Sequence, residues 1–189
     1  MKLFKNLLYL GLVMPLVFTA CDDDDDNGPE PPGGGEEEVI TTVSVVLTDG
    51  TTTQTISSVD LDGPGGTDAV PTGATLQANT RYSYTATFLN QTEDPVENVT
   101  EEILEEDEEH QIFWDFGSLG GTLNYTDADD EGRPIGVTGT ITTGDPGTGE
   151  YTLTLRHEPE KDAAGVADGD IANANGETDV EARFPITIE

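Results

Sequence analysis

The sequence predicts an all-β domain, a two-sheet sandwich of about eight strands with one short helix near residues 95–105. From Val39 onward, short segments rich in Val, Ile, Thr and Tyr alternate apolar and polar residues, which is typical of strands with one buried face. Clusters of Gly, Asp and Pro separate these segments and favour turns. Only one stretch has the apolar spacing of a helix instead.

Each predicted strand is defined by its apolar positions. The first covers residues 39–47, and Asp49 with Gly50 predicts a hairpin turn before a weaker strand through Ile56 and Val59. Aromatic side chains mark the next two strands, and we expect them to supply much of the core. The strands after the first hairpin cover residues 82–88, 112–116, 123–125, 135–141, 151–155 and 180–188.

The predicted helix has recognisable start signals. Asp94, Pro95 and Glu97 match an N-cap, a first-turn proline and a capping-box acid. The apolar residues that recur at helical spacing are Val96, Val99 and Ile103. Acidic residues follow near its end, where they face the negative end of the helix dipole. We therefore expect the helix to stop soon after Leu104.

The strand pattern resembles that of immunoglobulin-like modules, but their cysteine pair is absent. An open barrel is the alternative architecture. Cys21 is the only cysteine, which excludes an internal disulfide and a thiolate zinc cluster.

The N-terminus has the layout of a signal peptide. Lys2 and Lys5 precede an apolar stretch over residues 7–20, which is too short for a spanning helix of about 20 residues. The small residues before Cys21 resemble the lipobox of bacterial lipoproteins, with Phe18 where that family usually has Leu. The resemblance implies that residues 1–20 are removed and that Cys21 carries acyl chains such as palmitate, which would anchor the protein.

Residues 21–38 predict a lipidated, acidic Pro/Gly tether ahead of a β-sandwich domain over residues 39–189. Five aspartates at residues 22–26 resemble the surface-export signal of Bacteroidetes lipoproteins. The resemblance implies an outer-membrane lipoprotein at the cell surface. Alternatively, the run is a solvated spacer that keeps the fold off the membrane, and the two roles are compatible. The face of the outer membrane on which the domain lies stays open.

The chain is strongly acidic, with 39 acidic and 7 basic residues and a net charge of −32. Nucleic acid is excluded as a partner, because phosphate binding needs clustered Lys and Arg. The basic residues after the signal peptide lie apart among acids. Adaptation to a salty habitat explains this charge, and a dedicated cation store is the alternative.

A metal site is predicted around His157, which shares the inward parity of Leu153 and Leu155. Residues 161–177 then form a long loop, which is unusual unless a function or ligand orders it. The oxygen donors in and after this loop are Asp168, Asp170, Asn173, Glu177 and Asp179. They suit calcium, whereas His157 would favour a transition metal. Alternatively, they hold the loop's own turns. His110 is expected to be only a charged neighbour of the acidic run.

A second, weaker calcium turn is predicted at Asp127, Asp129 and Glu131, which occupy the first, third and fifth places of an EF-hand-like loop. An EF-hand itself is excluded, because Thr138 stands at the twelfth place and no helices flank the loop.

The segments around Arg156, His157 and residues 176–179 resemble small Bacteroidetes lipoproteins often labelled type 1 periplasmic binding fold. That label implies alternating helices and parallel strands. With the lipoprotein resemblance, it implies a protein that captures a metal ion or small ligand for a TonB-dependent receptor.

Enzymatic activity is not expected. No GxSxG nucleophile elbow occurs, and with this many acids a carboxylate pair arises by chance. The alternative function is a structural or adhesive surface module that binds protein or glycan through its loops.

Overall fold

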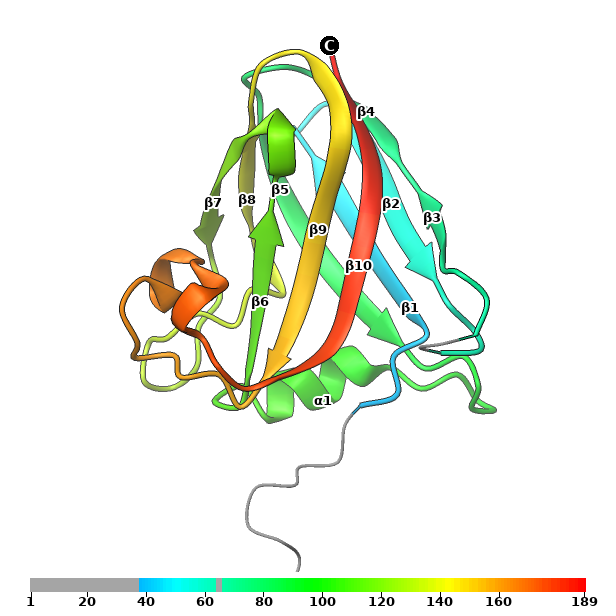
Figure 1. Cartoon of the computed structure of the whole chain (residues 1–189), viewed down its shortest axis with the longest axis vertical. Helices are drawn as coiled ribbons and strands as arrows, with labels where there is room; N and C mark the ends of the chain where they lie inside the picture. The colour runs from blue at the N-terminus through cyan, green and yellow to red at the C-terminus, as the bar shows by residue number, and fades with distance from the viewer. Residues whose placement is uncertain (1–37, 64–65) are drawn as a thin grey trace, which may run out of the picture. The chain divides into compact units, whose positions relative to one another are not determined.

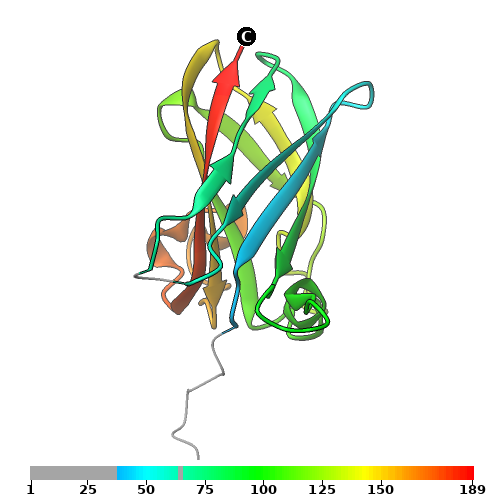
Figure 2. The same ribbon diagram turned by 90° about the vertical axis from the view of Figure 1, so that its right-hand side faces the viewer.

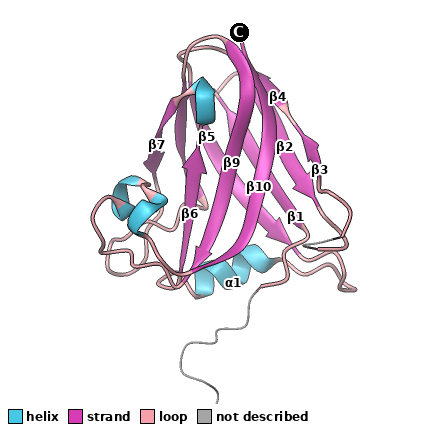
Figure 3. Cartoon of the chain, in the orientation of Figure 1, coloured by secondary structure: helices cyan, strands magenta, loops and turns pink. Residues whose placement is uncertain are grey.

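The computed structural model describes residues 38–63 and 66–189, and these form a sandwich of two β-sheets. The all-β prediction is confirmed, and the strands dominate the view in Figure 3. The six-stranded sheet has the order β3-β2-β1-β5-β8-β7. Its strands are β1 (Thr42–Thr48), β2 (Thr53–Val59), β3 (Val70–Thr72), β5 (Arg81–Leu89), β7 (Gly121–Tyr125) and β8 (Thr138–Thr143).

The four-stranded sheet has the order β4-β10-β9-β6 and covers the first sheet (Figures 1 and 2). Its strands are β4 (Ala74–Leu76), β6 (His110–Asp115), β9 (Gly147–His157) and β10 (Glu177–Ile188). All strand pairs are antiparallel except β10 with β4. The alternating helices and parallel strands of a periplasmic binding fold are therefore not the architecture of the described residues.

The ten strands of the described chain exceed the predicted eight by two short ones, β3 and β4. They have three residues each, too few for an alternating pattern to be visible. The chain passes from one sheet to the other between them, at Gly73. A Cβ there would lie 1.9 Å from the carbonyl oxygen of Pro185, so only glycine allows this crossing.

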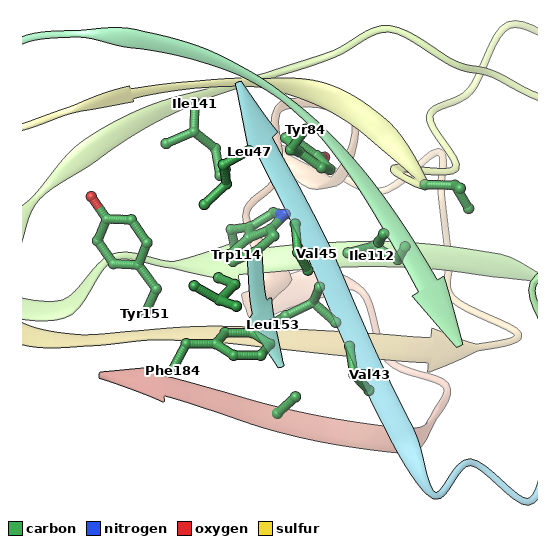
Figure 4. Packing of buried hydrophobic residues seen from close by; sticks show 14 of the residues in the cluster. Val43, Val45, Leu47, Tyr84, Ile112, Trp114, Ile141, Tyr151, Leu153 and Phe184 are labelled. Atoms are coloured by element: carbon green, nitrogen blue, oxygen red, sulfur yellow. The ribbon is translucent and has the colours of Figure 1, made fainter. Parts of the chain in front are cut away.

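The core lies between the sheets, and the predicted alternation supplies it (Figure 4). Val43, Val45 and Leu47 of β1 are at most 1% exposed. Trp114 lies at the centre of an aromatic group, with its ring centroid 5.5 Å from that of Tyr84 in an edge contact. The other aromatic rings around Trp114 are those of Phe116 and Phe184. The prediction of an aromatic core is confirmed.

Helix α1 (Val99–Glu105) forms where a helix was predicted, but it begins later than the start signals indicated. Glu97 forms an isolated β-bridge with Asn90, and its carboxylate accepts a hydrogen bond from Asn90 Nδ2 at 3.0 Å. This pairing keeps the chain extended before the helix, so the predicted N-cap at Asp94 is wrong. The helix ends at Glu105, as the acidic run predicts.

Helix α1 is tied to the six-stranded sheet through Thr100. Its hydroxyl accepts a hydrogen bond from the backbone N–H of Phe88 at 2.8 Å and lies 3.2 Å from the carbonyl oxygen of the same residue. Val99 and Ile103 are buried beside it. The helix thereby closes the end of the sandwich at which β6 begins and β9 ends (Figure 1).

The long loop after β9 folds back over the outer face of β6, and it contains two short 3-10 helices, η2 (Val166–Asp168) and η3 (Ile171–Asn173). Phe113, Val166 and Ala174 form a second, smaller apolar cluster there. Both faces of β6 are therefore buried. A further 3-10 helix, η1 (Gly117–Leu119), follows β6. Among the described residues, no helix has the length and apolar character needed to cross a bilayer.

Candidate metal centre

Two histidines meet at one end of the four-stranded sheet. His110 is the first residue of β6, and His157 is the last residue of β9. The two are direct partners in the antiparallel register, so their side chains emerge side by side. Each shares the parity of inward-facing apolar residues on its strand, such as Ile112 and Leu155. Both imidazoles are therefore buried, with the side chain of His110 fully enclosed and that of His157 8% exposed.

Asp179 reaches the two histidines because of a β-bulge in β10. Thr178 pairs with Arg156 and Val180 pairs with Leu155, which leaves Asp179 without a partner on β9. A bulge turns a side chain away from the regular alternation of its strand. The carboxylate of Asp179 is fully buried, with one oxygen 3.8 Å from His110 Nε2.

Glu38 completes a four-residue group, which we call the histidine–carboxylate cluster: Glu38, His110, His157 and Asp179. Glu38 lies just before β1, on the segment that leads into the sandwich. One of its carboxylate oxygens is 2.9 Å from His110 Nε2, and the other is 3.7 Å from His157 Nδ1. Its side chain is only 6% exposed. Four segments far apart in the sequence thus supply one side chain each.

The cluster has the dimensions of a four-coordinate metal site. One potential ligand atom from each residue lies within 4.8 Å of all the others. His157 Nδ1 and His110 Nε2 are 3.1 Å apart. Two nitrogens bound to zinc at 2.0–2.1 Å with a tetrahedral angle lie about 3.3 Å apart. The observed separation therefore leaves room for a zinc-sized ion after small side-chain adjustments.

Burial and mutual charge set the protonation of the cluster. Burial acts to lower the pKa of His110, but the hydrogen bond and charge of Glu38 outweigh it and raise that pKa above its ordinary value. Burial likewise acts to raise the pKa of Glu38, and His110 outweighs it and leaves that pKa lowered. Asp179 lacks such a partner, so burial, together with the charge of Glu38, raises its pKa to about 6. The cluster therefore holds one tight ion pair and one poorly compensated carboxylate.

Hydrogen bonds orient His110 but leave other atoms of the cluster unsatisfied. His110 Nδ1 lies 3.2 Å from the carbonyl oxygen of Glu106, to which it donates, so Nε2 faces the cluster. Within the described residues, Glu38 Oε2, His157 Nε2 and both carboxylate oxygens of Asp179 are buried without a hydrogen-bond partner. Buried polar atoms without partners are costly. A bound cation would satisfy both carboxylates.

The donor set selects among metals. Two imidazole nitrogens with two carboxylates suit zinc and neighbouring transition metals, whereas calcium prefers six to eight oxygen ligands. The cluster therefore favours a transition metal over calcium. Metal capture would displace the proton from His110 Nε2 to solvent, because a ligating imidazole nitrogen must be unprotonated.

A pocket of about 600 Å³ adjoins the cluster. Its walls come from the start of β1, the end of β2 and the bulge of β10, and both Glu38 and Asp179 line it. Asp60 and Asp62 also line the pocket, and one oxygen of Asp60 is buried without a partner in the described structure. The acidic lining provides a route by which a cation can reach the buried side chains.

The structure brings two of the residues in the predicted metal site together and separates the others. His157 and Asp179 belong to the cluster. Asp168, Asp170, Asn173 and Glu177 are exposed and lie outside it. Asp170 accepts a hydrogen bond from the backbone N–H of Ala172 at the start of η3, and Asn173 donates to the carbonyl oxygen of Ala164. These two side chains hold the turns of their own loop.

The residues of the predicted calcium turn have other partners. Asp127 accepts hydrogen bonds from the backbone N–H groups of Gly136 and Thr138 at 2.8 and 2.7 Å. Asp129 is buried and binds the side chains of Arg133 and Lys161. The carboxylate of Glu131 forms an ion pair with Arg133 at 2.9 Å. In the described structure, these three side chains stabilise the turn through hydrogen bonds and ion pairs within the protein.

Sequence reasoning missed Glu38 and His110. The parity of His110 with Ile112 and Trp114 was an available signal, so the expectation that it is only a charged neighbour is wrong. Glu38 gives no such signal, because it resembles the acidic residues before it and falls within the predicted tether. The predicted lipidation site, Cys21, lies outside the described residues.

Comparisons with protein-family models, with curated protein sequences and with solved structures find no match to this chain. The geometry of the cluster is therefore the basis for a functional interpretation.

Proposed function

We propose that this protein is a lipid-anchored surface protein whose β-sandwich captures a divalent transition metal ion, with zinc as the ion that the donor set favours. The observation that carries this proposal is the histidine–carboxylate cluster, and above all the buried, unpartnered carboxylate of Asp179. An isolated buried carboxylate destabilises a fold unless a cation compensates it. A carboxylate that needs a cation, placed beside two histidines, is a ligand set suited to a metal ion.

The acidic surface and the adjoining pocket support capture from outside. A net charge of −32 raises the local concentration of cations. The pocket connects the cluster to its surroundings through Glu38 and Asp179. An ion would enter past the acidic side chains that line the pocket. It would then exchange its bound water molecules for the four side chains of the cluster.

The test is calorimetric titration of the full-length chain, stripped of metal by a chelator, with zinc, copper and calcium. We expect zinc and copper to bind and calcium to bind much more weakly. Asp179→Asn should weaken zinc binding by more than about 100-fold, because even an outer-shell change costs 10–100-fold. Asp170→Asn is the matched control, since Asp170 is exposed and lies outside the cluster. Equal affinity in both variants, or no heat and no thermal shift with any ion, would refute metal capture and favour an adhesive or structural module.

The anchor is proposed from residues 1–21, whose layout resembles that of bacterial lipoproteins. Labelling of cells with an alkyne analogue of palmitate should mark the wild-type chain and leave Cys21→Ser unmarked. Protease treatment of intact cells should remove the domain if it is exposed on the outer surface. Transfer of the ion to a TonB-dependent receptor follows from the same resemblance, and co-purification with such a receptor after cross-linking tests it.

A further inference from the structure

A second group of potential ligands lies beside the first and shares His157 with it. Glu109, His157 and Glu158 each offer one ligand atom within 4.8 Å of the other two. Glu109 comes just before β6, and Glu158 just after β9. Their backbones are joined, because Glu158 N–H donates to the carbonyl oxygen of Glu109 at 2.7 Å. The group therefore sits where the two strands that carry the histidines end.

The two ring nitrogens of His157 could serve the two groups separately. Its Nδ1 faces the histidine–carboxylate cluster, 3.1 Å from His110 Nε2. Its Nε2 is buried and has no hydrogen-bond partner among the described residues. The side chain as a whole is only 8% exposed. Because Nδ1 already faces the first cluster, the enclosed and unpartnered Nε2 is the nitrogen left to serve the carboxylates of Glu109 and Glu158.

The two glutamates also lack a compensating charge. They lie opposite each other at the strand ends, where like charges destabilise a strand pair. No Lys or Arg of residues 38–63 and 66–189 forms an ion pair with either of them. A cation bound between them would remove this repulsion.

We propose that a second divalent metal ion binds between Glu109 and Glu158, with the His157 imidazole bridging it to the ion of the histidine–carboxylate cluster. This inference rests on the proposed function, because it takes His157 Nδ1 as a ligand of the first ion. Binding at Nε2 replaces the hydrogen of that nitrogen, which leaves to solvent as a proton. The bridged ring then donates one nitrogen to each ion. Because Glu109 and Glu158 are exposed, the second ion binds more weakly and exchanges faster than the first.

Copper(II) is the probe, because its electron paramagnetic resonance signal reports both the number of ions and their coupling. The full-length, metal-free chain should bind two copper ions per molecule. The first equivalent should give the full signal of an isolated ion. The second should reduce the total signal rather than double it, because two copper(II) ions joined by one imidazole ring couple antiferromagnetically.

The double variant Glu109→Gln with Glu158→Gln isolates the second ion. It should bind one copper with an undiminished signal, and its unfolding temperature without metal should not fall, because both side chains are exposed. The control, Glu105→Gln with Glu160→Gln, changes two exposed acids at the same end of the domain and should still bind two coupled ions.

The outcomes separate the two proposals. Two ions whose signals simply add would place the second ion away from His157 and overturn the bridge. One ion in both the wild type and the double variant would overturn the second site and leave the proposed function standing. No bound copper at all would overturn both.

Discussion

The substitution Asp179→Asn is expected to stabilise the metal-free protein while it weakens zinc binding. The Asp179 carboxylate is fully buried, and both of its oxygens lack a hydrogen-bond partner in the described structure. Asparagine has nearly the same volume but carries no charge, and its amide can donate to the unpartnered oxygen of Glu38. The substitution therefore removes the cost of a buried charge and also removes a metal ligand.

The pKa of Asp179 gives the size of the effect. Burial raises that pKa from 3.8 to about 6. The folded state therefore holds the proton more tightly than the unfolded state, and stability is lost as the pH rises from about 4 through 6. A pKa raised from 3.8 to about 6 corresponds to about 2–3 kcal/mol of destabilisation at pH 7.5. The neutral variant should recover a large part of this free energy of unfolding.

Urea unfolding at pH 7.5 measures both effects, once with a chelator and once with excess zinc. With the chelator, Asp179→Asn should unfold at a higher urea concentration than the wild type. With zinc, the wild type should gain more stability than the variant, because a ligand stabilises the state that binds it. Asp170→Asn should follow the wild type in both conditions. A variant that is less stable than the wild type with the chelator would show that Asp179 is compensated, and the reasoning would fail.

Three further predictions concern the rest of the domain. Without metal, the free energy of unfolding should fall as the pH rises from 5 to 8. Asp179 ionises over this range, and His110, whose pKa is raised, loses its proton. A rise in stability over that range in urea titrations would contradict this. Phe113→Ala should cost about 3–5 kcal/mol and expose the loop that covers β6 to protease, and unchanged protection of that loop would contradict its packing role. Asp129→Ala should cost about 3–5 kcal/mol because it leaves Lys161 buried without its carboxylate and removes the hydrogen bonds to Arg133. Thermal unfolding should show that adding Lys161→Met recovers the part of the loss that comes from Lys161, and no recovery would contradict this reasoning.

The alternation of apolar residues was enough to predict the sandwich. A period of two assigns each side chain to one face, and that local rule placed the core residues of β1, β5 and β9 correctly. It also pointed His157 inward. The start of α1 was harder, because the signals around Asp94 were overridden by the pairing of Asn90 with Glu97. Helix-capping rules consider only the residues at the helix terminus, so they cannot predict a bridge to Asn90.

The loop after β9 shows a second limit of the sequence pattern. Its Asp and Asn residues give it the composition of an ion-binding loop. The side chains of Asp170 and Asn173, however, form hydrogen bonds with backbone groups of the same loop. The loop is ordered by apolar packing of Val166 and Ala174 on Phe113. The sequence shows Phe113 on the outer face of its strand, but only the tertiary structure shows that the loop after β9 packs on it.

By itself, the sequence determined the faces of the strands, the strongly acidic net charge and the inward direction of His157, because each depends on composition or on residues close together in the chain. The tertiary structure decided the membership of the metal centre. Register placed His110 opposite His157, a bulge turned Asp179 inward, and the fold of the chain before β1 brought Glu38 to them. Such a site joins four distant segments, and the pairing of strands, which no local pattern encodes, is what brings them together.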